Sequence, residues 1–478
     1  MGWLGGAGVA VGAVVVLVAT AGCGGAGPAG SGAGGTGADQ RYGAAPTRHP
    51  EVTYQPEVVL VAGGGAAVRS VSDDALTWRI DPGADGADEV ARGRIMFLTG
   101  RAVGRVLDVR RDGRDLAVTL GPVDITEVIR DGVFSGDRPL DTPVRYEADS
   151  PFWAELDAGP GEFPSARTPE GVTRTAAVRN LPAGPSALRP AVAAIGRSAP
   201  SPGFRVTPVC CAGGVGARFS YDGGDVRIAG SATLLMGSPS ASFHLEIRGG
   251  RVLRAQLQVR GMVGLRLDIA AATTARRNVN KRLAVPVDFS VPIGEVLGVP
   301  FSATASQTIG VQTAFSARDG NIKASAEWSL SGALGFGYAN GSFSPQLPGS
   351  FAVRNSIVDS MTGPSVGVNG IIVTHQAAFR LGLGAFGFTA GLYATLTTTV
   401  GLTVGSAAGA PLALCRGAQL GIWTDYGVGY TIPGYLAKAI NAFLDLFNAT
   451  PIEQRGGIGK VDSVYQKYVV QPDVKLCR

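Results

Sequence analysis

Alternation of apolar and polar residues dominates the second half of the chain. Apolar side chains recur at every second position, with mainly polar residues or glycine between them, in the runs Ala255–Ile269, Phe301–Phe315, Ile322–Phe336 and Phe386–Val404. A period of two places one face of a strand against a core and the other against water. The runs exceed the usual strand of about 5–6 residues. They predict a mainly β protein with a large antiparallel sheet of long strands, either barrel-like or folded over itself.

Two turn signals and one helical repeat complete this half. Asp319-Gly320-Asn321 and Asn340-Gly341 favour tight hairpins, and therefore pairing between strands adjacent in the sequence. Apolar residues at helical spacing predict a C-terminal amphipathic helix at about 434–448, between Pro433 and Pro451. We expect this helix to cap an open end or face of the sheet. A helix that touches a membrane or gates a pore is the alternative.

The first half predicts a small β-rich domain at 51–157. Its strand-like runs are Glu57–Ala62, Ile95–Leu98, Val103–Val109 and Leu116–Leu120. A hairpin signal at Arg111–Asp115 separates the last two, and Pro122–Ile129 predicts a short helix with Pro and Asp near its start. Residues 158–209 are rich in Pro, Ala, Gly, Ser and Arg and predict a linker or surface wrap, whereas 210–478 form the long-strand domain.

Several segments of the small domain carry a family resemblance. They are Gly93–Phe97, Gly104–Val109, Val118–Leu120 and Thr126–Gly132, with Tyr338–Pro345 further along. Together they resemble a module of uncharacterised secreted, lipoprotein-type bacterial β-rich proteins. The resemblance implies a strand–hairpin unit followed by a long β-rich region. It implies no activity, since that family has no established one.

The N-terminus resembles an export signal of the bacterial lipoprotein type. An apolar core at Ala7–Ala19 has the length of a secretory signal and is too short to span a membrane. Cys23 follows small residues, as in signals whose thiol receives a diacylglycerol, although no Lys or Arg precedes the core and Thr20 stands where Leu is commoner. We expect a signal at 1–22, a lipid anchor at Cys23 and a Gly-rich flexible tether at 23–50. A secretory signal cut near Ala21 is the alternative.

Four further cysteines, Cys210, Cys211, Cys415 and Cys477, predict two disulfides in an exported chain. Cys210 and Cys211 are adjacent, and joining them would strain the peptide between them. Each therefore pairs with one of Cys415 and Cys477, in either arrangement. A Cys₄ metal site is the alternative, although the C-x₂-C spacing typical of such sites is absent.

Net charge and composition limit the classes of partner that the protein could bind. The formal net charge is +5, and no RNA- or DNA-binding motif is present, so we expect no nucleic acid. The densest basic patch consists of Arg276, Arg277, Lys281 and Arg282. It is either a solvated turn or a contact for an anionic envelope polymer or lipid.

Candidate chemistry is sparse. The three histidines, His49, His244 and His375, have no metal-ligand spacing, and no G-x-S-x-G elbow supports a hydrolytic triad. Gly63-Gly64-Gly65 lacks the third glycine of a dinucleotide-binding turn. An acidic loop, made of Asp81, Asp85, Asp88 and Glu89, departs from the EF-hand pattern, although it could hold Ca²⁺. We assign no catalytic residue, cofactor or metal.

These observations favour an envelope-anchored lipoprotein with a non-enzymatic binding or structural role on the outer face of a bacterial membrane, or a secreted protein if Cys23 is unmodified. A carrier of lipid or another apolar ligand in a β-lined cavity is the first alternative, and a membrane-inserting β-barrel or pore the second. A hydrolase is not excluded. The state of the interior, filled or hollow, discriminates best between these readings.

Overall fold

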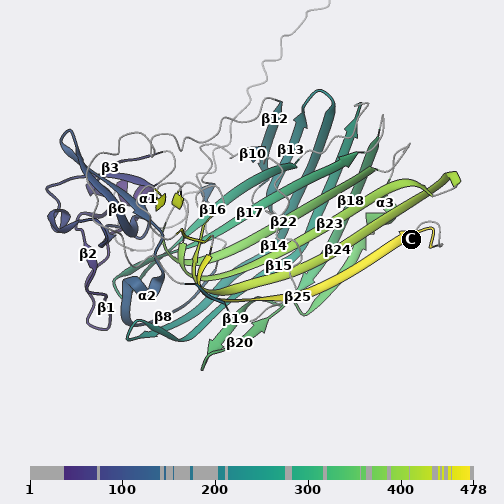
Figure 1. Cartoon of the computed structure of the whole chain (residues 1–478). Helices are drawn as coiled ribbons and strands as arrows, with labels where there is room; N and C mark the ends of the chain where they lie inside the picture. Colours follow the sequence, from purple (N-terminus) through teal and green to yellow (C-terminus); the bar gives the residue numbers. More distant parts are fainter. Residues whose placement is uncertain are drawn as a thin grey trace, which may run out of the picture. The chain divides into compact units, whose positions relative to one another are not determined.

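A computed structural model describes residues 37–72, 76–139, 145–146, 154–155, 173–175, 203–209, 214–274, 282–315, 320–355, 357–361, 369–384, 389–407, 410–432, 440–441, 444–445, 451–453 and 455–473 (Figure 1). Three sheets account for most of these residues. Residues Thr36–Arg478 cluster as one compact unit. The predicted mainly β class with long antiparallel strands is confirmed.

The small domain is a six-stranded sheet. Its strands, in spatial order, are β2 (Val58–Leu60), β5 (Ile95–Phe97), β6 (Val103–Asp112), β7 (Asp115–Gly121), β4 (Thr77–Ile80) and β3 (Val68–Val71). A short helix α1 (Gly37–Tyr42) and two 3₁₀ turns, η1 (Gly64–Ala67) and η2 (Ala87–Glu89), complete it. Its own core gathers around Trp78, Met96 and Val118. The hairpin predicted at residues 111–115 joins β6 to β7.

Two long strands form the centre of a ten-stranded sheet. They are β14 (Val226–Arg248) and β15 (Arg251–Thr273). The other strands are β1 (Thr53–Tyr54), β8 (Ile129–Pro139), β12 (Phe204–Val209), β13 (Gly214–Asp222), β18 (Asn321–Ser331), β19 (Leu334–Ala339), β20 (Ser342–Gln346) and β21 (Ser350–Asn355). β13 and β8 pair in tandem along β14, and β18 and β19 pair in tandem along β15.

A nine-stranded sheet contains the remaining strands. They are β9 (Arg145–Tyr146), β10 (Ala154–Glu155), β11 (Thr173–Thr175), β16 (Arg282–Val296), β17 (Val299–Phe315), β22 (Asn369–Leu383), β23 (Thr389–Ala407), β24 (Ala410–Thr431) and β25 (Arg455–Gln471). Six of these, β16, β17 and β22 to β25, are at least 15 residues long and run antiparallel to their neighbours.

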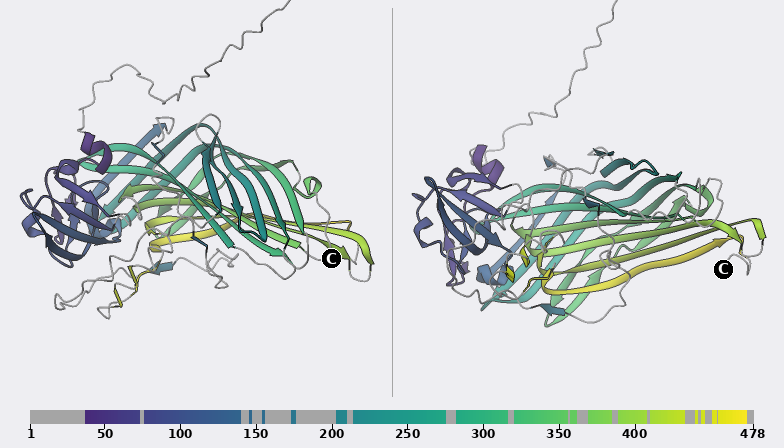
Figure 2. Two further views of the ribbon diagram at one scale, coloured as in Figure 1. Left: turned by 90° about the horizontal axis from the view of Figure 1, so that it is seen from above. Right: turned by 45° about the horizontal axis from the view of Figure 1, so that its top comes forward.

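The ten-stranded and nine-stranded sheets lie face to face (Figure 2). Phe301 on β17 contacts Phe134 on β8 and Phe243 on β14, with ring centroids 5.1 and 6.0 Å apart. Further along, Phe336 on β19 stacks on Tyr426 on β24 at 5.5 Å. One buried cluster includes side chains of both sheets. The folded-over form of the prediction therefore holds, with two sheets in place of one continuous sheet.

Two local predictions were wrong. The run 322–336 is divided into β18 and β19, because Gly332 interrupts it with a positive φ of 93°. The turn at 319–321 does not make a hairpin, because β17 belongs to the nine-stranded sheet and β18 pairs with β15 in the other. Asn340-Gly341 does join a hairpin, β19–β20, with φ values of 52° and 79°.

The predicted helices fared differently. The one at residues 122–129 is confirmed as α2 (Ile125–Val128). Most of the helix expected at 434–448 lies outside the described residues. The residues of this range that are described, Ile440, Asn441, Leu444 and Asp445, are helical. Phe204–Val209, in the range expected as linker, form β12. A four-residue helix α3 (Ile357–Ser360) was not expected.

Strand β5 joins the small domain to the two large sheets. Met96 and Leu98 are buried in the small domain's own core. Ile95 and Phe97, which point to the opposite face, belong to the core of the large sheets. Backbone contacts reinforce this joint, because Gly384 N–H donates to Gly100 O at 2.8 Å and Thr47 N–H donates to Gly298 O at 2.7 Å.

Candidate functional site

The structure describes only one of the predicted cysteine sites. Cys23, Cys210, Cys211 and Cys477 lie outside the described residues. Cys415 is half-buried near the start of β24 and is disulfide-bonded. Its pairing with a particular cysteine, and the lipid at Cys23, stay predictions.

The remaining sequence candidates are dispersed. His244 lies on β14 and His375 on β22, whereas His49 lies in the segment before β1. In the acidic loop, Asp81 pairs with Arg69 and accepts from Gly83 N–H at 2.8 Å. Gly65 N–H donates to Asp39 Oδ1 at 3.0 Å, so the glycine turn packs against α1. Among the described residues, no three His, Cys, Asp or Glu side chains are grouped to hold a metal. Of the basic patch, Arg282 begins β16, and the other three residues lie outside the description.

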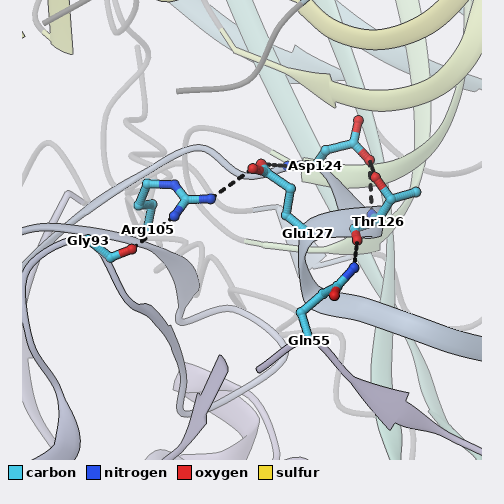
Figure 3. A network of polar contacts seen from close by, with 6 residues as sticks. All are labelled: Gln55, Gly93, Arg105, Asp124, Thr126 and Glu127. Carbon is cyan, nitrogen blue, oxygen red and sulfur yellow. Dashed lines mark hydrogen bonds and ion pairs between the residues drawn. The ribbon is translucent and has the colours of Figure 1, made fainter. Parts of the chain in front are cut away.

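A polar network surrounds α2 where the small domain meets the large sheets (Figure 3). Asp124 caps the helix: its Oδ1 accepts from Thr126 N–H at 2.9 Å, while Glu127 Oε2 accepts from Asp124 N–H at 3.0 Å. This capping box satisfies two of the amides that the start of a helix leaves unpaired. Gln55 Nε2 donates to Thr126 O at 2.8 Å and ties β1 to the same turn. We call these residues, with Arg105, the junction network.

Buried charge distinguishes the junction network. Arg105 on β6 donates to Glu127 Oε1 at 2.8 Å and to Gly93 O at 2.9 Å. The Arg105 and Glu127 side chains are only 10% and 11% exposed. Burial raises the pKa of Asp124, against the lowering effect of its hydrogen bonds from Thr126. The network therefore fixes α2 and the small domain by charges that water hardly reaches.

The outer face of the nine-stranded sheet continues these polar contacts. A Cβ atom at Gly457 on β25 would lie 2.8 Å from Asp124 Oδ2, so the bare glycine gives the carboxyl room. Asp425 on β24 forms an ion pair with Arg455, yet burial raises its pKa above the ordinary value, with Arg455 and Arg380 opposing the shift. Burial raises the pKa of Tyr393 as well. The capping box, the Arg105–Glu127 pair and these buried groups together hold α2 against the two sheets.

A second buried polar contact lies between the two large sheets. His375 Nε2 is 2.8 Å from Gln307 Oε1, and Gln307 Nε2 donates to Val215 O on β13 at 2.9 Å. Burial lowers the pKa of His375 from 6.5 to about 4, so the imidazole is neutral at physiological pH. This contact links β22 and β17 to the opposite sheet.

The interior of the large sheets is filled where it is described. A cavity of about 30 Å³ lies between β14–β15 and β17–β22, lined by residues that include Ala241, Leu257, Ala303 and Phe379. Ligand pockets usually measure about 300–1,000 Å³. A surface groove of about 400 Å³ lies at the β14–β15 and β19–β20 hairpin ends, where Glu246 is the cross-strand partner of Arg254.

One large surface on the outer side of the nine-stranded sheet lacks charge, although Thr374 and Thr397 within it are buried. On the outer side of β17, β22, β23, β24 and β25, four successive cross-strand rows contain no Asp, Glu, Lys or Arg. We call them the neutral face. The rows are Ala314–Gly370–Thr403–Gly417–Val470, Gln312–Ile372–Gly401–Gln419–Tyr468, Gly310–Thr374–Thr399–Gly421–Gln466 and Thr308–Gln376–Thr397–Trp423–Ser463. Ile372 and Tyr468 are 44% and 64% exposed.

The two aromatic residues of the neutral face lie along the sheet. A Cβ atom at Gly421 would clash with the Trp423 ring, and one at Gly417 would lie 3.7 Å from the Tyr468 hydroxyl. The Trp423 ring therefore lies over Gly421, and the Tyr468 hydroxyl lies near Gly417. The hydroxyls of Thr374 and Thr399 are 3.4 Å apart.

The outer side of the ten-stranded sheet differs sharply. Two adjacent rows there carry the neighbours Arg266 and Glu327, 2.8 Å apart, and Asp268, whose carboxylate accepts from Ser231 at 3.1 Å. The next row carries Lys323. The absence of charge is thus a property of these four rows, since Asp425 and Arg455 lie further along the outer side of the same sheet.

These features define a class: a face-to-face two-sheet β protein, with a small β domain joined through buried charge and one neutral outer face. The chain belongs to the family described as domain of unknown function DUF8402, whose profile matches residues 184–460. A second profile, domain of unknown function DUF8403, matches residues 38–131. No curated protein and no solved structure matches the chain. Among the described residues, no helix combines the length and apolar character needed to cross a membrane.

Sequence reasoning overlooked both the junction network and the neutral face. The capping box could have been recognised, since Asp124 precedes Glu127 by three residues. The neutral face could have been recognised in part, because the outward positions Thr397, Thr399, Gly401 and Thr403 alternate with the apolar run. Its extent depends on register, which alternation alone does not give.

Proposed function

We propose that the protein is an envelope-anchored lipoprotein with a non-enzymatic binding role, in which the two-sheet body presents the neutral face. The acyl anchor at Cys23 would hold it to the outer face of a bacterial membrane, and residues 24–36 would give reach. The rest of the expected tether is tied to the body through α1 and through the bond from Thr47 N–H to Gly298 O. Disulfides among Cys210, Cys211, Cys415 and Cys477 would brace the body. Contact with an anionic envelope polymer or lipid through the basic patch stays part of the proposal.

The filled interior is the single observation that supports this role best. The cavity of about 30 Å³ between β14–β15 and β17–β22 is too small for an acyl chain. A carrier needs such room, whereas a display protein needs a body that keeps its surface in shape. Bulky side chains such as Phe301 and Phe336 occupy the space between the sheets. The cross-sheet bond from Gln307 to Val215 O holds the sheets in one register.

The joint between the domains supports the same role. Ion pairing at Arg105 and Glu127, together with the shared cores on either side of β5, makes the small domain a fixed part of the body. A platform of this kind binds a partner without spending free energy on its own ordering.

Fractionation and envelope binding test the proposal. The wild-type chain and Cys23→Ser are expressed in a bacterial host; we expect membrane association for the first and release for the second. For the binding assay, Cys23→Ser, which cannot insert through a lipid, serves as the parent chain; it is purified and mixed with isolated envelopes, and the substitutions below are made in it. Gln419→Glu, in the neutral face, should abolish sedimentation with the envelopes, whereas Gln256→Glu, an exposed match on β15, should not. Envelopes that bind neither the parent chain nor the control would contradict a binding role.

A further inference from the structure

The neutral face has the chemistry of a surface for a neutral polymer. It spans five strands, or about 19 Å across, and four rows, or about 20 Å along the strands. Its outward side chains are mostly Thr and Gln, whose hydroxyl and amide groups both donate and accept hydrogen bonds. Five glycines keep the surface low between them. Such a surface offers hydrogen bonds over a wide area without attracting counter-ions.

The aromatic rings add a second kind of contact. Trp423 is half-buried with its ring over Gly421, and Tyr468 is 64% exposed with its hydroxyl near Gly417, so both rings are within reach of a ligand. The electron-rich face of an aromatic ring attracts weakly positive C–H groups. A pyranose ring presents C–H groups on its flat sides and hydroxyls around its rim. Stacking on rings and hydrogen bonding to Thr and Gln are thus the two contacts that a sugar requires.

Charge complementarity selects among possible occupants. An anionic polymer or a charged protein surface would leave its charges without partners on the neutral face, which costs free energy. The other outer face, with Arg266, Asp268 and Glu327, is suited to charged partners. A neutral ligand leaves nothing unpaired on this face. Tyr468, at 64% exposure, is also accessible without any movement of the sheet.

We propose that the neutral face binds a neutral polysaccharide, with Trp423 and Tyr468 stacking on sugar rings and Gln419, Thr399 and Thr403 bonding their hydroxyls. This inference rests on the proposed binding role and names its ligand class. The binding step is non-covalent, so no bond of the polymer is broken.

Affinity electrophoresis of the full chain in gels that contain glycogen, mannan or galactan tests the inference. We expect at least one polymer to retard the wild type. Tyr468→Ala should weaken the retardation about fivefold, since a stacked ring contributes roughly 1 kcal/mol and this corresponds to about fivefold in affinity. Tyr468→Phe should keep it. Gln419→Glu should weaken it, whereas Gln256→Glu and Leu253→Ala, both on β15, should not. Retardation should persist in 0.5 M salt, because no ion pairs are involved.

Three results would overturn the glycan assignment. They are no retardation by any of the three polymers, retardation by polygalacturonate alone, or a dimer in sedimentation that Gln419→Glu dissociates, which would make a second copy the occupant. Competition separates this failure from that of the proposed function. Envelope binding that persists in excess neutral polysaccharide would refute only the glycan assignment. A complete lack of envelope binding would refute the binding role itself.

Discussion

Replacing Glu127 by Gln tests the junction network directly. Glu127→Gln keeps an oxygen that can accept from Asp124 N–H but removes the negative charge facing Arg105. The Arg105 side chain is 10% exposed, so water compensates the remaining guanidinium poorly. Breaking a buried pair costs about 3–5 kcal/mol. Gly93 O still accepts from Arg105, so we expect the lower end, about 3 kcal/mol.

Urea unfolding followed by tryptophan fluorescence and far-ultraviolet circular dichroism measures this loss. Trp78 and Trp328, each 2% exposed, report on the small domain and on the large sheets. Asp112→Asn is the matched control, because its partner Arg79 is 47% exposed, and such surface pairs contribute less than about 1 kcal/mol. The double variant Arg105→Met/Glu127→Gln removes both charges, keeps an oxygen that can accept from Asp124 N–H, and should regain most of the loss.

The reasoning fails on either of two outcomes. A loss for Glu127→Gln no larger than that of Asp112→Asn would mean that the charge is already well solvated. A double variant as unstable as Glu127→Gln would mean that shape, and not charge, holds the joint.

Three further predictions follow from buried groups. The pKa of His375 is near 6.5 in the unfolded chain, whereas burial lowers it to about 4 in the fold. The unfolded chain therefore binds the proton more tightly, and stability should decline by roughly 3 kcal/mol as the pH falls from about 6.5 to 4. Urea midpoints against pH should show a flatter decline for His375→Gln, and coinciding curves would contradict this. Burial raises the pKa of Asp425, so its charge costs stability at neutral pH; Asp425→Asn should be neutral or stabilising by up to about 1 kcal/mol at pH 7, with the advantage shrinking in acid. A clear loss at pH 7 would refute it. Gly100→Ala should cost about 2 kcal/mol, because its Cβ would clash with Pro300 O, whereas Gly337→Ala, with open space, should leave the thermal midpoint unchanged.

Local patterns predicted the strands well, and long-range pairing set the limit. Alternation placed β15, β17 and β23 close to their observed bounds, because burial of one face imposes a period of two. The same alternation cannot say which strands share a sheet. β17 and β18 are separated by a good turn signal, yet β18 pairs with β15 because the chain crosses to the opposite sheet.

The candidate surfaces were harder to foresee for the same reason. Arg105 and Glu127 are 22 residues apart and meet only after β6 and α2 are packed. The rows of the neutral face combine residues as distant as Gln312 and Tyr468, which requires the register of five strands. Composition offered no warning, since charges elsewhere on the molecule offset their absence here.

The run Ile95–Leu98 limits how the chain could be divided during evolution. Their side chains point alternately into the core between the large sheets and the core of the small domain. Dividing the chain after β8 would therefore expose a large apolar surface on each fragment. We therefore expect the two segments that the family models match, 38–131 and 184–460, to be inherited together.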